Sequence, residues 1–134
     1  MDEPNATRSP MRTPLGRAIG LGSAKEGVGH WWRQRTSALL LVPLVLWFVI
    51  AVIGHVGADH ATFVGWVRSP GPAMLLIVLL AATFYHAALG LQVVIEDYVR
   101  GEGLRIAALL AMRLLCIAFA VRGIFAVLKM AFGA

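Results

Sequence analysis

One histidine lies near the middle of a long uncharged stretch. His86 stands between about Pro72 and Ile95, where no Asp, Glu, Lys or Arg occurs. An ionisable side chain in such a segment is costly in a membrane and is usually functional or paired. Neutral imidazole can ligate iron, and Ala82 and Gly90, one turn away on either side, leave a slot for a flat macrocycle. The spacing favours haem ligation and hydrogen bonding to another helix equally, and a proton relay is a third possibility.

A carboxylate and a phenol follow at the end of the same stretch. Asp97 comes eleven positions after His86, which places it within about 20° of the same helical face and about 16 Å along the axis. The phenol of Tyr98 can donate to a quinone carbonyl, and the carboxylate can orient a quinone or supply protons. Both residue types are also common anchors at the membrane interface.

Polar and aromatic residues crowd the start of the first apolar segment: Trp31, Arg33, Gln34, Arg35 and Ser37. Arginine recognises carboxylates and phosphates through its planar fork, so haem propionates, quinone headgroups and lipid phosphates are all candidate targets. Arg113 and Arg122 lie inside the last apolar segment, nine positions apart, and therefore point to opposite faces of a helix. We expect Arg113 to pair with a carboxylate or a propionate.

These residues are carried by a small, very apolar chain. It has 134 residues, of which 59% are hydrophobic and 14% charged, with a mean hydropathy of +0.77 and a single cysteine. That composition argues against a soluble enzyme, a disordered tail or a disulfide-bonded module. The sequence predicts an all-α integral membrane protein with three spans. They lie at about 36–57, 72–95 and 106–128, each long enough for a ~30 Å hydrocarbon core.

The predicted organisation is a head at 1–35 followed by a three-helix membrane anchor at 36–132. Within the first span, Pro43 is expected to kink the helix. The segment 58–71 is expected to be a loop.

Basic residues predict the orientation. Residues 1–35 carry six Lys and Arg, the 96–105 connection carries two and the 58–71 connection one. The N-terminus and the 96–105 connection are therefore expected on the cytoplasmic side, in a bacterial inner membrane. No stripe of basic residues indicates nucleic-acid binding, and a glycine-rich stretch near residues 20–27 fits neither common phosphate-binding pattern.

Taken together, several segments resemble one family. They are residues 22–27 (GSAKEG), 30–35 (HWWRQR) and 86–92 (HAALGLQ) and the pair Asp97–Tyr98. Over residues 20–130 the chain is similar to the smaller hydrophobic membrane anchor of succinate dehydrogenase, a succinate:quinone oxidoreductase. The resemblance implies that His86 is an axial ligand of haem b, with the second ligand supplied by a histidine of the other anchor subunit. It also implies that Tyr98 hydrogen-bonds ubiquinone beside Asp97. Arg35 is expected near the haem and quinone, and Arg33 could take its place.

The resemblance further implies a role in a larger redox complex. The expected partners are a flavoprotein that oxidises succinate, an iron–sulfur subunit, a second membrane anchor and lipid. This chain carries no flavin or cluster motif, and one cysteine cannot hold a cluster of the usual four-thiolate kind. We therefore expect it to be non-catalytic alone. The alternatives are a small transport subunit with His86 and Arg113 in a proton relay, and a structural anchor without a cofactor.

Overall fold

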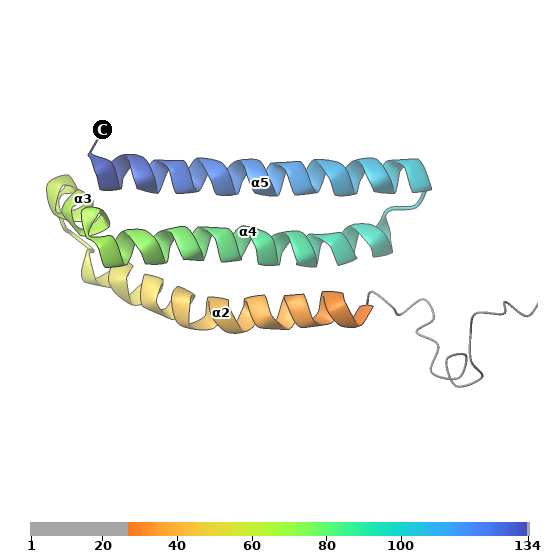
Figure 1. The fold of residues 1–134 in the computed structure, drawn as a ribbon, viewed down its shortest axis with the longest axis horizontal. Helices are drawn as coiled ribbons and strands as arrows, with labels where there is room; N and C mark the ends of the chain where they lie inside the picture. The colour runs from red at the N-terminus through yellow and green to blue at the C-terminus, as the bar shows by residue number, and fades with distance from the viewer. Residues whose placement is uncertain (1–26, 134) are drawn as a thin grey trace, which may run out of the picture.

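The computed structural model describes residues 27–133, and within this range every regular element is an α-helix. The helices are α2 (Gly27–Gly54), α3 (His60–Arg68), α4 (Pro70–Tyr98) and α5 (Glu102–Phe132), shown in Figure 1. Three of them, α2, α4 and α5, are long and apolar enough to cross a membrane. The prediction of an all-α protein with three candidate membrane spans is confirmed.

The long helices extend beyond the apolar segments that predicted them. Residues 27–35, expected in the head, form the first turns of α2, and α5 begins at Glu102 rather than near 106. A charged residue ends an apolar segment but does not end a helix, which continues until the φ and ψ angles of the backbone leave the helical range. Val99 is the C-cap of α4, Gly101 is the N-cap of α5 with a φ angle of 97°, and Gly133 is the C-cap of α5 with a φ angle of 71°. Positive φ angles favour glycine. The rest of the predicted head, residues 1–26, lies outside the described residues.

The prediction of a loop over 58–71 is wrong for most of that segment. α3 is a nine-residue helix, and Asp59 caps its N-terminus by accepting a 2.9 Å hydrogen bond from the backbone N–H of Thr62. Hydrogen bonds from Thr62, through its side chain and its backbone, lower the pKa of Asp59. An Asp before a short apolar run is a helix-start signal, and it outweighed the shortness of the segment.

The three long helices lie side by side with α4 in the middle (Figure 1). α4 packs on both α2 and α5, whereas the backbones of α2 and α5 do not approach each other along their described lengths. α4 and α5 approach closely, because a Cβ atom built on Gly123 would lie 3.2 Å from Leu80 Cδ1. α2 continues through Pro43, where the sequence predicts a kink, and its ribbon curves along its length (Figure 1).

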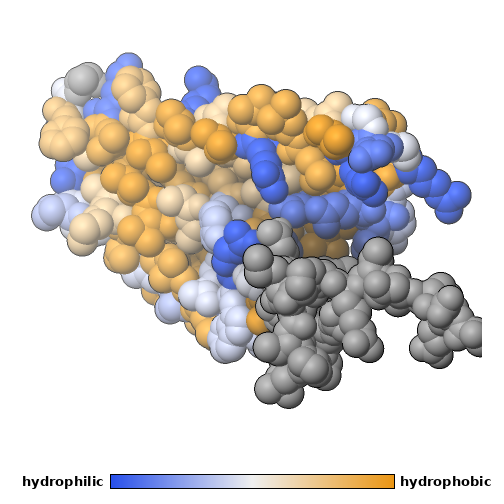
Figure 2. All heavy atoms as spheres, turned by 45° about the vertical axis from the view of Figure 1, so that its right-hand side comes forward, coloured by the Kyte–Doolittle hydropathy of each residue, from blue (hydrophilic) through white to orange (hydrophobic). Residues whose placement is uncertain are grey.

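The best-packed region is at the α3 end of the molecule. Val67 is 1% exposed and clusters with the buried side chains of Ala73, Leu76 and Val127. Arg68 Nε donates to the carbonyl of Met130 at 3.3 Å, which joins α3 to the last turn of α5. Hydrophilic residues gather mainly at the opposite end, where α4 ends and α5 begins (Figure 2).

Candidate functional site

His86 faces α2 from the middle of α4. Its Nδ1 atom lies 2.9 Å from Ser37 Oγ, and its Nε2 atom lies 3.3 Å from the amide nitrogen of Gln34. Ser37 is 6% exposed and is the buried polar residue of the described chain. The interhelical hydrogen bonding that the sequence allowed for His86 is therefore present between α4 and α2.

The contacts around Ser37 assign the imidazole proton. Ser37 Oγ donates its single hydrogen to the carbonyl of Gln34 at 3.0 Å, so it accepts from Nδ1–H of His86. The lone pair is then on Nε2, where it accepts from the Gln34 amide. The nitrogen that is free to bind a metal is thus covered by one side-chain amide.

Gln34 occupies the space beside Gly90. A Cβ atom built on Gly90 would meet only Gln34 Nε2, at 3.6 Å. The amide oxygen of Gln34 is buried and has no hydrogen-bond partner among the described residues. The same is true of His30 Nε2, one turn earlier on α2. The slot that Ala82 and Gly90 predicted is therefore partly filled, by a side chain that is poorly satisfied where it lies.

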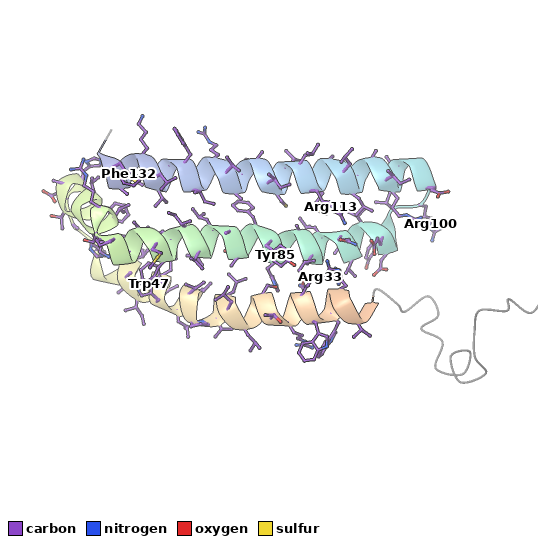
Figure 3. The ribbon with its side chains drawn as sticks, in the orientation of Figure 1. Arg33, Trp47, Tyr85, Arg100, Arg113 and Phe132 are labelled. Carbon is purple, nitrogen blue, oxygen red and sulfur yellow. The ribbon has the colours of Figure 1, made fainter. Side chains whose placement is uncertain are left out.

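Two open cavities flank this region on α4. One has a volume of about 500 Å³ and includes Ser37, Ala82 and Tyr85 in its walls. The other, of about 570 Å³, lies along α4 and α5 and is bordered by Gln92 and Arg113. Arg33 and Tyr85 line both, and Figure 3 shows Arg33 and Arg113 on either side of α4 near the same end of the molecule.

A chain of hydrogen bonds connects the Arg113 side chain to Glu96 through Gln92. Its Nη2 donates to Gln92 Oε1 at 3.1 Å, and Gln92 Nε2 donates to Glu96 Oε1 at 2.8 Å. The direct partner of Arg113 is therefore an amide, which links the guanidinium to a carboxylate one turn further along α4. Sequence reasoning did not identify this partner, although Gln92 belongs to one of the segments that carry the family resemblance.

Asp97 and Tyr98 are the last two residues of α4. Both are exposed, and Tyr98 retains 81% of its accessible surface. Neither side chain hydrogen-bonds another described residue, and Tyr98 lines neither cavity. The unbroken helix places Asp97 about 16 Å along the axis from His86, as predicted.

Arg35 lies away from His86. Its guanidinium carbon is 5.5 Å from the ring centroid of Trp31, a cation–π contact on an exposed part of α2. Arg33 is the arginine of this pair that borders the cavities. The sequence signal for the side of α2 that contacts α4 is the spacing of His30, Gln34 and Ser37, four and then three residues apart.

Within residues 27–133, no three His, Cys, Asp or Glu side chains come close enough to share a metal ion. His55 is remote from His86, since its Nδ1 atom lies 2.7 Å from the carbonyl oxygen of Ala51 and its ring contacts Trp66 of α3. His86 is thus the histidine that α2 and α4 place at the centre of the spans.

Comparisons with known proteins agree on one family. Residues 9–120 match the family model described as the succinate dehydrogenase/fumarate reductase transmembrane subunit. The succinate dehydrogenase hydrophobic membrane anchor subunit of Rickettsia bellii (strain RML369-C) is 34% identical over 87% of this chain and 93% of that protein. The protein of the same description from Paracoccus denitrificans is 31% identical over 91% and 94%. The succinate dehydrogenase membrane anchor subunit of Reclinomonas americana is 30% identical over 69% and 80%.

Proposed function

The chain belongs to the succinate dehydrogenase/fumarate reductase transmembrane subunit family, as a multi-pass membrane anchor subunit, and from this premise we propose that His86 is an axial ligand of haem b. The proposal rests on the position of the His86 imidazole between α2 and α4. Its Nδ1 atom is hydrogen-bonded to Ser37, which leaves the lone pair on Nε2. A second histidine, from the other anchor subunit, completes the ligation. Haem b supplies a one-electron redox centre inside the membrane when it is bound.

The residues around His86 suit such a group. Nε2 is covered only by the Gln34 amide, whose oxygen is buried without a partner among the described residues. A cavity of about 500 Å³ lies beside Ser37, has mostly apolar walls and includes Arg33 but not His86 in its lining. The Arg33 guanidinium would be suited to bind a propionate of a haem held nearby, since a guanidinium binds a carboxylate through two N–H groups. Arg35, the position implied by the family resemblance, remains part of the proposal as a cation at the same end of α2.

We further propose that Tyr98 and Asp97 form part of the ubiquinone-reduction site. The Tyr98 phenol donates to a quinone carbonyl, and Asp97 orients the headgroup or supplies a proton. Both side chains are exposed at the end of α4 and are uncommitted within the described residues. The rest of the pocket comes from partner subunits.

The proposed complex contains a flavoprotein, an iron–sulfur subunit and a second membrane anchor. Succinate is oxidised on the flavoprotein, and electrons pass through the iron–sulfur subunit to the quinone. The N-terminus and the connection between α4 and α5 face the cytoplasm of a bacterium, as the distribution of Lys and Arg favours. This chain docks the soluble subunits and contributes one wall of the quinone pocket.

The test is a reduced-minus-oxidised optical spectrum of the purified complex. His86→Ala is expected to remove the b-type haem signal. The matched control His60→Ala, at the exposed start of α3, is expected to retain it. A full haem signal in His86→Ala would reject His86 as the ligand and would favour a structural anchor or a transport subunit. A relay through His86 and Arg113 receives no support from the hydrogen bonds within residues 27–133, which leave the two side chains in separate networks.

A further inference from the structure

The two α2 side chains that contact His86 are held very differently. Ser37 is buried, and its hydroxyl is engaged on both sides, by His86 Nδ1 at 2.9 Å and by a backbone carbonyl at 3.0 Å. Gln34 makes one longer contact, 3.3 Å from its amide nitrogen to Nε2. Its amide oxygen is buried without a donor among the described residues, which disfavours this placement of the side chain because the oxygen has lost its water.

The two contacts also act on different nitrogens of the ring. An acceptor at Nδ1–H fixes the tautomer and the ring orientation, which leaves Nε2 basic and pointing in a set direction. A donor at Nε2 does the reverse, because it occupies the lone pair that a metal would need. The Ser37 contact therefore favours metal ligation by His86 at Nε2, whereas the Gln34 contact competes with that ligation.

Building on the proposed function, we propose that Ser37 and Gln34 have opposite effects on haem binding: Ser37 is a positioning residue that holds His86 in the ligating tautomer, and Gln34 is a displaceable cap on Nε2. Binding of iron at Nε2 replaces the Gln34 contact and leaves the Ser37 contact in place. Neither His86 nor Gln34 lines the open cavity of about 500 Å³ beside Ser37, so the room for iron at Nε2 comes from movement of the Gln34 side chain.

The two roles predict changes of opposite sign. Loss of an outer-shell partner of a ligating histidine typically weakens metal binding about 10- to 100-fold, so we expect a loss of that size in Ser37→Ala. Removal of the Gln34 amide abolishes a competing hydrogen bond, so we expect Gln34→Ala to bind haem about two- to tenfold more tightly. A residue that merely fills space would give weaker binding when truncated.

The experiment is a haemin titration of the whole complex, assembled in haem-limited cells and followed by the b-type absorbance. Each variant is normalised to assembled complex by its succinate oxidation with an artificial acceptor. Ser37→Thr and Ser37→Val are a matched pair of nearly equal volume, of which only the threonine keeps the hydroxyl. We expect Ser37→Thr to retain haem affinity and Ser37→Val to lose it, which separates the hydrogen bond from packing if Ser37→Ala fails to assemble.

The haem midpoint potential is a second readout. Loss of the Nδ1–H acceptor makes the imidazole a weaker donor, so the potential is expected to become more positive in Ser37→Val and to stay near its original value in Ser37→Thr. Unchanged affinity and potential in Ser37→Val would overturn the role of Ser37. Equal or weaker binding in Gln34→Ala would overturn the cap. Neither result contradicts the proposed function, which is rejected only if His86→Ala retains its haem.

Discussion

The hydrogen-bonded chain from Arg113 through Gln92 to Glu96 gives a quantitative prediction. Gln92→Leu keeps a side chain of similar bulk but removes both hydrogen bonds, at 3.1 Å and 2.8 Å, each to a charged group. Side-chain hydrogen bonds between membrane helices are worth about 0.6 kcal/mol on average and about 1.7 kcal/mol at most. Only the Arg113–Gln92 bond joins two helices, whereas the Gln92–Glu96 bond lies within α4, where an i,i+4 pair is worth about 0.2 to 0.5 kcal/mol. The two bonds together therefore correspond to about 0.8 to 2.2 kcal/mol.

The Arg113 share of that energy can be isolated with a double-mutant cycle. We expect Gln92→Leu and Arg113→Leu each to lower the thermal midpoint of the purified complex, and the double variant to lose less than the sum. The coupling should be about 0.6 to 1.7 kcal/mol. Arg122→Leu is the matched control, because Arg122 lies on the same helix but makes no hydrogen bond to Gln92. Additive effects of Gln92→Leu and Arg113→Leu would refute the assignment of Gln92 as the partner of Arg113.

Three further predictions concern the ends and the packing of the helices. Tyr98→Phe should slow quinone reduction about fivefold, the worth of one hydrogen bond, while succinate oxidation with an artificial acceptor is unchanged; equal loss in both assays would remove Tyr98 from the quinone site. Gly123→Leu should lower the thermal midpoint of the complex because it crowds Leu80, and Leu80→Ala should restore part of the loss; a neutral Gly123→Leu would contradict the close approach of α4 and α5. The pKa of Asp59 is lowered from its ordinary value of 3.8, so the charged carboxylate stabilises the α3 cap at any pH above 3.8. This contribution is lost as the pH falls through the lower pKa of the folded protein. Hydrogen exchange of the α3 amides should therefore become faster in acid relative to Asp59→Asn, and identical pH profiles for the two proteins would count against the cap.

The sequence was sufficient for the helical class and for the spans. Uncharged apolar stretches of this length have one stable arrangement in a membrane, because every backbone N–H and C=O must be paired within the segment. The position of His86 within α4 followed from the same argument. The ends of the helices did not follow, since Glu102 and Arg33 are polar but good helix formers and lie inside α5 and α2.

Contacts between helices were harder to predict from one sequence. The partners of His86, Ser37 and Gln34, lie 49 and 52 positions away, and Gln92 lies 21 positions from Arg113. Helical periodicity gives the face of each helix but not the neighbour or the register of the packing. Arg33 and Arg35 illustrate this limit of sequence-based prediction. They lie two positions apart on α2, and only Arg33 borders the two cavities.

A density map of the assembled complex would show whether His86 binds haem iron through Nε2. We expect His86 Nε2 to contact the iron, Ser37 Oγ to stay at Nδ1 and the Gln34 amide to have turned away. A map in which Nε2 still faces Gln34, with the iron held by other side chains or with no porphyrin beside the ring, would contradict the ligation of haem iron by His86.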